Sequence, residues 1–319
     1  MPWFRPKSSA AATAKAPAER LADVLAAVRA IELRAGQLRT DVLSGGFRSA
    51  FRGAGVEVGE VREYAEGDDP RSVDWNVTAR LGRPFVKRFV EERERTLVFV
   101  LDLGAGMAAG VGAWSLRQAA ARLCACLGRL AIDNHDRVGL LAGAQPAGVT
   151  RFVLPDRGPG HVLRILRDVV ELPTLPGGSA LDALLARAAG RLRRGAVLFV
   201  LSDFAGVAPL AALAPCARRH DVVVVPLLAA ELSAPPAAMV RGVDPVSGAQ
   251  ATFDFTADRV RAAWLQQVAT WWAERHGQFE RAGCDVLPLR LPGQADLEAI
   301  AAPLRRFFHR RAMRPGRRG

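Results

Sequence analysis

Two short apolar runs, LVFVL (97–101) and VLFVL (197–201), decide the fold class of this chain. Each has the length of one strand, and an aspartate follows within two residues. Continuous apolar runs of this kind are typical of strands buried on both faces, as in a parallel sheet covered by helices. Four further runs bring the number of expected strands to six: RVGLLAG (137–143), RFVL (151–154), DVVVVPLL (221–228) and DVLPLRL (285–291).

Segments with helical periodicity separate these runs. The clearest lies at 115–132, where apolar residues recur at the i, i+3, i+4 spacing of one helix face. The alternation of strands and helices predicts an α/β domain with a doubly wound, mostly parallel sheet over 96–308. Further helices are expected at about 160–170, 179–189, 209–218, 258–282 and 296–308.

Two segments depart from this alternation. Residues 44–95 are rich in glycine and charge and contain candidate strands at 56–64 and 84–90. In the second segment, 239–255, the turn residues 244–248 lie between two extended arms, which predicts a hairpin inserted into the main domain. We expect the two segments to form one small β-rich appendage.

The ends of the chain differ in composition from its body. Residues 1–20 are rich in Ala, Pro and Ser and are expected to form a flexible leader, followed by an N-terminal helix at 21–42 within a region that runs to 95. The net charge is +12, but the stretch 304–319 holds seven arginines and no acid, which leaves about +5 for the rest. A basic tail at 309–319 supports only nonspecific contact with nucleic acid, so a nucleic-acid partner is not favoured.

Several functional classes lack their sequence signals. No apolar run approaches the roughly 20 residues of a membrane span, and the first residues lack the apolar core of a secretory signal, so we expect a cytoplasmic protein without membrane contact. The motifs G-x-S-x-G, H-E-x-x-H and G-x-x-x-x-G-K-[ST] are absent. The pattern Gly104-x-Gly106-x-x-Ala109 is not followed by an acid at the end of the next strand, as a dinucleotide site requires. These observations predict a protein without enzymatic activity or a cofactor.

One long run resembles a known family. The run GEVREYAEGDDPRSVDWNVTARLGRPFVKRFVEERERTLVFVLDLGAGM (59–107) is similar to the bacterial family called domain of unknown function 58, and the resemblance extends from about Ala30 to Phe308. The family's core is von Willebrand factor A-like. The resemblance implies a protein-binding module that is a partner or adaptor of a MoxR-type AAA+ ATPase. Its implied role is protein maturation or complex assembly, in which it would present a client protein to the ATPase.

The same resemblance implies a metal site that has lost ligands. Relatives of the core bind a divalent cation through Asp-x-Ser-x-Ser at the end of the first strand. Asp102 matches the leading aspartate, while Gly104 and Gly106 stand where the serines belong; Ser179 and Asp203 match the remaining hydroxyl and carboxylate. Mg²⁺ requires about six oxygen ligands, so this degenerate site is expected to hold it weakly or not at all. Two interpretations stay open: Asp102 and Asp203 cap loops, or they serve a metal-dependent hydrolase.

The segment GDDPRSVDW (67–75) is a second candidate site. As a partner-recognition surface it would comprise Asp68, Asp69, Arg71, Asp74, Trp75 and Arg80. The structural alternative is that Asp69-Pro70 begins a turn, Asp74 caps it, the arginines pair with Asp68 and Glu63, and Trp75 anchors the appendage to the sheet. The two interpretations are compatible with one another.

Overall fold

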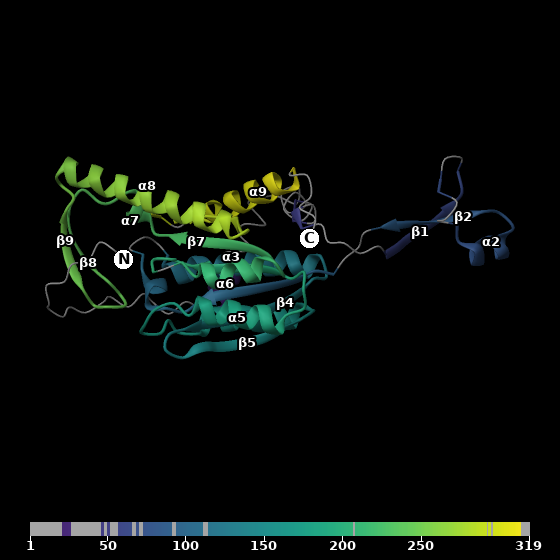
Figure 1. Cartoon of the computed structure of the whole chain (residues 1–319), viewed down its shortest axis with the longest axis horizontal. Helices are drawn as coiled ribbons and strands as arrows, with labels where there is room; N and C mark the ends of the chain where they lie inside the picture. Colours follow the sequence, from purple (N-terminus) through teal and green to yellow (C-terminus); the bar gives the residue numbers. More distant parts are fainter. Residues whose placement is uncertain are drawn as a thin grey trace. The chain divides into compact units, whose positions relative to one another are not determined.

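The computed structural model of the chain describes residues 21–26, 46–47, 50–51, 57–65, 68–69, 73–90, 94–110, 114–206, 208–291, 293–294 and 296–313. The chain divides into two compact units (Figure 1). The smaller unit extends from Phe51 to Arg95, and the larger one holds the residues up to Ala50 and those from Thr96 onward. The expected leader at 1–20, most of the expected helix at 21–42 and the last residues of the basic tail lie outside the described residues.

The smaller unit is a hairpin that carries a short helix between its strands. Strand β1 (Glu57–Glu63) pairs antiparallel with β2 (Phe85–Val90), and the register shifts once, between Val58 and Glu60. Helix α2 (Trp75–Leu81) lies between them in sequence. The candidate strands at 56–64 and 84–90 each contain one of these observed strands. The local sequence pattern of this segment therefore predicted its two strands correctly.

The larger unit is built on a sheet of seven strands with the order β10-β7-β6-β3-β4-β5, in which β11 also pairs with β7. All neighbouring strands are parallel except β4 and β5, which are antiparallel. The prediction of an α/β fold with a mostly parallel sheet is therefore confirmed. The strands are β3 (Thr96–Asp102), β4 (Arg137–Ala144), β5 (Gly148–Asp156), β6 (Val197–Ser202), β7 (Asp221–Leu228), β10 (Asp285–Val286) and β11 (Leu289–Arg290).

The expected number of six strands was wrong because the last strand is interrupted. The run at 285–291 contains Pro288, which has no N–H to give to a neighbouring strand. On either side of it, Leu287 N–H donates to the carbonyl of Val224 and Leu291 N–H to that of Leu228, each at 2.8 Å. The proline thus splits one predicted strand into β10 and β11, both parallel to β7.

Helices cover both faces of this sheet (Figure 1). Successive side chains of a strand point to opposite faces. Val98 and Val100 of β3 accordingly share one buried cluster with residues of α5, α6 and α8. On the other face, α3 contacts β4, β7, α4 and α9. The helices of this unit are α3 (Leu116–Asp133), α4 (Pro159–Glu171), α5 (Leu181–Arg191), α6 (Leu210–Ala217), α7 (Ala230–Ser233), α8 (Asp258–Arg281) and α9 (Glu298–Ala312), with a 3-10 turn η2 (Ala105–Ala108).

The hairpin at 239–255 belongs to the larger unit. Strands β8 (Met239–Val243) and β9 (Gln250–Asp254) form a separate antiparallel pair. The turn is closed by Asp244, whose Oδ1 accepts from the N–H groups of Val246 (2.8 Å) and Ser247 (3.1 Å). Phe253 and Phe255 pack edge-on against Trp264 of α8. The expectation of one β-rich appendage is corrected, because the two hairpins lie in different sheets and different units.

Helix α9 continues beyond its predicted end at residue 308, into the region expected to be a basic tail. The guanidinium of Arg311 binds the carboxylates of Asp221 and Asp285, the latter at 2.6 Å, and donates to the carbonyl of Ala50 at 2.8 Å. Its side chain is only 16% exposed. The first part of the expected tail is therefore a packed element that joins the amino ends of β7 and β10.

No helix among the residues that the structure describes has both the length and the apolar character needed to cross a bilayer.

Candidate functional site

The order of strands reverses between β3 and β6. From β3 the chain crosses to β4 on one side, and from β6 it crosses to β7 on the other. In doubly wound sheets, ligands bind at the carboxyl ends of the strands that flank such a reversal. Asp102 is the last residue of β3, and Asp203 directly follows β6. The topology thus brings together the two aspartates that the sequence singled out.

Asp102 is fixed by two hydrogen bonds. Its Oδ1 accepts from the backbone N–H of Gly104 at 2.8 Å, and its Oδ2 accepts from the hydroxyl of Ser202 at 2.6 Å. Asp102 is 2% exposed and Ser202 is completely buried. Buried carboxylates are tolerated when their oxygens are hydrogen-bonded in this way. The Asp102 to Ser202 bond therefore ties the end of β3 to the end of β6.

The carboxyl of Asp203 has a raised pKa. Burial, the largest cause, and the nearby charge of Asp102 together raise the pKa from 3.8 to about 6, although hydrogen bonds from Ala205 and Ser202 oppose the shift. The Ala205 N–H donates to Oδ1 at 3.0 Å. A carboxyl with a pKa near neutrality can take up and release a proton under physiological conditions. Asp203 therefore has two accessible charge states.

The backbone after Asp203 is strained. Phe204 has φ of 47°, in the left-handed region that bulky residues rarely adopt. Its N–H donates to Ser202 Oγ at 3.1 Å, and its ring packs edge-on against Phe279 of α8, with 4.9 Å between ring centroids. Such strain costs on the order of 1–3 kcal/mol and is concentrated at functional sites. The buried ring and the serine hydroxyl hold this turn in place.

Ser179 reaches the same edge through the loop before α5. It forms a bridge with Ala144 at the end of β4, and its hydroxyl accepts from the N–H of Leu181 at 3.3 Å. The preceding residue of the loop also lies beside the segment that follows β3, because a Cβ built on Gly104 would lie 3.2 Å from the carbonyl of Gly178. Ser179 is thus in the neighbourhood of Asp102, but its hydroxyl is engaged by its own helix.

Gly104 and Gly106 are required for space rather than for backbone conformation. Gly104 has φ of −59°, and Gly106 is not among the residues with positive φ. A Cβ at position 106 would lie 2.0 Å from Asp203 Oδ2, and one at position 104 would lie 3.1 Å from Asp102 Oδ1. The Asp203 carboxylate therefore occupies the volume that a serine at position 106 would need.

The donors at this edge fit a magnesium ion poorly. Asp102, Asp203, Ser179 and Ser202 supply oxygens, but both oxygens of Asp102 and the hydroxyls already have partners within the protein. Among the described residues there is no group of three or more His, Cys, Asp or Glu that could hold a metal ion. Because Mg²⁺ demands near-octahedral oxygen coordination, these residues match it less well than a complete adhesion site would.

Ser202 was not predicted as a site residue. The available signal was its position, since a polar residue that ends a buried apolar strand must find a partner inside the protein. The partner itself, 100 residues earlier in the chain, follows only from the pairing of β3 with β6.

Comparison with known proteins places this chain in a family. The family described as "Protein of unknown function DUF58" matches residues 60–274. The chain belongs to the DUF58 family. Relatives include the uncharacterized proteins Rv1480 of Mycobacterium tuberculosis and Mb1516 of Mycobacterium bovis, each 34% identical over 210 residues. The aligned region covers 64% of this chain and 64% of each relative, so the chain spans somewhat less than two thirds of their length.

The DUF58 match includes the GDDPRSVDW segment, in which two aspartates have local structural roles. Asp74 is 8% exposed, and its Oδ1 accepts from the N–H of Val77 at 3.3 Å, which caps the start of α2. Its own N–H donates to the carbonyl of Phe85 at 2.8 Å. The Oδ2 of Asp68 accepts from the N–H of Ala65 at 2.9 Å. Both aspartates thus stabilise turns of the smaller unit.

Other members of the proposed recognition surface face the solvent. The side chain of Trp75 is 72% exposed. That it anchors the appendage to the sheet concerns a contact between the two units and stays a prediction. Asp69 and Arg80 are also exposed. Glu63 forms an ion pair with Arg83 at 3.2 Å. Arg71 lies outside the described residues.

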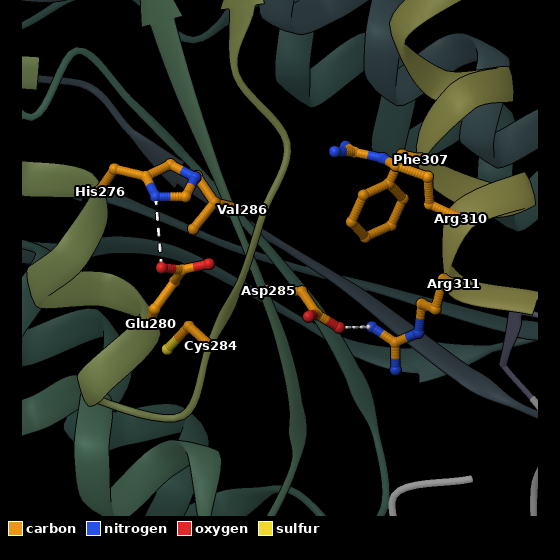
Figure 2. Close-up of a pocket in the computed structure, with 8 residues that line it drawn as sticks. All are labelled: His276, Glu280, Cys284, Asp285, Val286, Phe307, Arg310 and Arg311. Carbon is orange, nitrogen blue, oxygen red and sulfur yellow. Dashed lines mark hydrogen bonds and ion pairs between the residues drawn. The ribbon is translucent and has the colours of Figure 1, made fainter. Parts of the chain in front are cut away.

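A pocket of about 80 Å³ lies elsewhere on the larger unit, between α8, β10 and α9 (Figure 2). Figure 2 shows His276 directed to Glu280 and Arg311 directed to Asp285, at 3.5 and 2.6 Å. Within the pocket, Glu280 thus contacts His276, and Asp285 is paired with Arg311. Cys284 also lines the pocket but is buried. This arrangement stabilises the amino end of β10 and assembles no reactive group.

Proposed function

We propose that this DUF58 protein is a nonenzymatic, cytoplasmic protein-binding module with a von Willebrand factor A-like core. It acts as partner or adaptor of a MoxR-type AAA+ ATPase in the maturation or assembly of other proteins. The strand order β10-β7-β6-β3-β4-β5, with an antiparallel edge strand, is compatible with such a core. The ATPase partner rests on the family resemblance.

The observation that carries the proposal is the carboxylate pair at the reversal point of the sheet. Asp102 is immobilised by Ser202 and Gly104, whereas Asp203 lies against η2 on a strained turn. A fixed acidic edge suits recognition of a basic or hydrogen-bond-donating surface, because complementary charge gives specificity and raises association rates. The strain at Phe204 is a further reason to assign a role in recognition, since it opposes stability.

The smaller unit offers a second contact surface. Trp75 and Leu81 of α2 are 72% and 60% exposed, and Arg80 is exposed beside them in sequence. Exposed tryptophan and arginine side chains contribute disproportionately to protein interfaces. We assign Trp75 and Arg80 to partner contact, and Asp68 and Asp74 to the support of their turns.

The proposal is tested by affinity capture from extracts of the protein's own cells, followed by mass spectrometry. We expect an AAA+ ATPase to be retained by the wild type and to be lost or strongly reduced with Trp75→Ala. The matched control is Leu154→Ala, which removes another exposed apolar side chain (63%) from the larger unit. Recovery of nucleic acid alone, in complexes that dissolve at about 0.2 M salt as phosphate contacts do, would contradict the proposal.

One observation favours a second function, a metal-dependent hydrolase at the same edge. The pKa of Asp203 near 6 would suit a general acid or base. The test is hydrolysis of ester and phosphoester substrates with Mg²⁺ or Mn²⁺ added. Turnover by the wild type that disappears in Asp203→Asn would favour the hydrolase over the binding module. Turnover that is equal in both proteins would eliminate Asp203 as its origin.

A further inference from the structure

Two loops lie side by side at the opposite, amino-terminal edge of the sheet. One connects α5 to β6 and the other connects α6 to β7. Gly195 N–H in the first loop donates to the carbonyl of Arg219 in the second, and Asp221 N–H donates back to the carbonyl of Ala196, both at 2.9 Å. These bonds hold the side chains of the two loops in one region of the surface.

The two loops and the last residue of α5 carry five arginines whose side chains have no acidic partner among the described residues. None of the five side chains forms a hydrogen bond or ion pair with any residue that the structure describes, and four of them are exposed while Arg219 is half-buried. They are Arg191, Arg193, Arg194, Arg218 and Arg219. The single acid between residues 183 and 220 is Asp203, which follows the far end of β6. Asp221, the nearest acid in sequence, is bound by Arg311. The positive charge of these loops is therefore not balanced locally.

A buried histidine adjoins this cluster and lacks partners of its own. His220 is 5% exposed, and neither of its ring nitrogens has a hydrogen-bond partner in the described part of the chain. The Nε of Arg219 is likewise buried and unpartnered. Buried polar groups are hydrogen-bonded in the great majority of cases, so unsatisfied groups gathered in one place require an explanation. The unsatisfied atoms themselves are enclosed, so a ligand would contact the accessible arginine side chains around them, whose positive charge an anion would neutralise.

We propose that the α5–β6 and α6–β7 loops bind a phosphate group through Arg194 and Arg219. Guanidinium groups bind phosphate oxygens in a bidentate, charge-assisted geometry, and unlike lysine they present several donors in one plane. The remaining three arginines add electrostatic attraction at the rim. The ligand is either a free phosphate compound or the phosphate of a lipid headgroup.

His220 provides an internal reporter of this site. Burial lowers the pKa of its imidazole, and the charges of Arg219 and Arg194 lower it further. A bound phosphate neutralises those two charges and so removes part of the shift. Phosphate binding is therefore expected to raise the pKa of His220, which is measured from the pH dependence of its imidazole proton resonances. His309, which is exposed, serves as the reference signal.

The test is calorimetric titration of the full chain with pyrophosphate at low ionic strength. The variant Arg194→Gln with Arg219→Gln is expected to bind at least about tenfold more weakly, because it loses charge-assisted hydrogen bonds to the phosphate oxygens. The control, Arg167→Gln with Arg290→Gln, removes the same charge from exposed arginines elsewhere in the larger unit. Arg194→Lys with Arg219→Lys keeps the charge and should recover only part of the affinity. Unchanged melting temperatures establish that each variant is folded.

A second arm distinguishes the two sources of phosphate. Vesicles of phosphatidylcholine, with and without phosphatidic acid, are sedimented with the wild type and the variants. Cosedimentation that needs both phosphatidic acid and the two arginines assigns the site to a lipid headgroup, and pyrophosphate binding without cosedimentation assigns it to a free compound. Either pattern supports the site. The proposal is overturned if neither ligand binds the wild type, or if the variant and the control bind equally.

Discussion

The two ends of the sheet in the larger unit differ in how their buried polar groups are paired. At the carboxyl end, Asp102 and Asp203 share Ser202 and receive backbone N–H groups. At the amino end, the ring nitrogens of His220 and the Nε of Arg219 have no hydrogen-bond partner among the residues that the structure describes. Burial disfavours the charged form of both side chains, so the pKa of Asp203 rises and that of His220 falls. The carboxyl end thus pairs its buried polar groups within the protein, whereas the amino end leaves some of them unpaired in the described part of the chain.

The largest expected effect is at the amino end of the sheet, where Arg311 is paired with two carboxylates. Arg311→Ala leaves Asp221 and Asp285 without their shared cation, and their side chains are 34% and 15% exposed. Removing one partner of a buried pair costs about 3–5 kcal/mol, so for this partly exposed group we expect a loss of about 2–3 kcal/mol in the free energy of unfolding. Urea denaturation measures it. Truncation after Met313 is the control and should leave stability unchanged, since it spares α9.

At the carboxyl end, the close approach of Asp203 to η2 can be tested by adding volume. Gly106→Ser places its Cβ where Asp203 Oδ2 lies, and we expect a destabilisation of about 1–3 kcal/mol. Gly104→Ser meets its neighbours at 3.1 Å or more and should cost less. Thermal melting compares the two variants. Equal effects would show that Asp203 moves away at little cost.

The same two variants, combined, test the metal interpretation. Two added hydroxyls restore the number of ligands, and we expect Mg²⁺ to bind the double variant more tightly than the wild type. Calorimetry with Mg²⁺ and Mn²⁺, read alongside ligand-induced thermal stabilisation, measures the difference. Tight binding by the wild type would contradict the interpretation of a degenerate site.

Asp203→Asn should stabilise the protein at neutral pH. The pKa of Asp203 is about 6 in the folded state and 3.8 in the reference state, so the folded protein binds the proton more tightly. The stability that this group contributes is complete below about pH 4 and is lost as the pH rises through about 6. Allowing for partial exposure, we expect a gain of about 1–2 kcal/mol at pH 8 and little gain at pH 4, measured by denaturation at both pH values. A gain that is independent of pH would mean that ionisation is not the cause.

The smallest expected effect is at His220, and its pH dependence has the opposite sign. The pKa of His220 is lowered in the folded protein by burial and by Arg219 and Arg194, so the unfolded state takes up the proton first. Its contribution therefore reduces stability as the pH falls below about 6.5. His220→Gln should show a smaller fall in melting temperature between pH 7.5 and 5 than the wild type. His309→Gln, at an exposed position, should behave as the wild type does.

Several features of the candidate site could be predicted because they depend on neighbouring residues. The apolar runs predicted β3 and β6, and the aspartates after them lie at the carboxyl edge, as expected. The break at Pro288 could also have been predicted from the sequence, because proline has no backbone N–H to donate to a neighbouring strand. The exposure of Trp75 could not be predicted from the sequence, because an aromatic residue can pack or face solvent depending on the elements around it.

The distribution of charge shows most clearly what local patterns omit. Counted along the chain, the positive charge outside the tail is modest, and the body was not expected to be strongly basic. In the folded protein, Arg194 and Arg219 lie on two adjacent loops while the acid between them in sequence, Asp203, is at the other end of β6. The net charge adds together residues that lie at opposite ends of the sheet. These residues are separated by roughly 20 Å, the length of a strand of this size.

The sequence by itself determined most of the strands and helices and the residue types at each strand end, because periodicity and turn chemistry act over a few residues. The tertiary structure alone decided that Ser202 meets Asp102, that Arg311 joins two strands, and that two arginine-bearing loops lie together. These contacts join residues 24 or more positions apart, which become neighbours through the order of the strands in the sheet. Strand order results from the packing of the whole domain, and no short segment contains it.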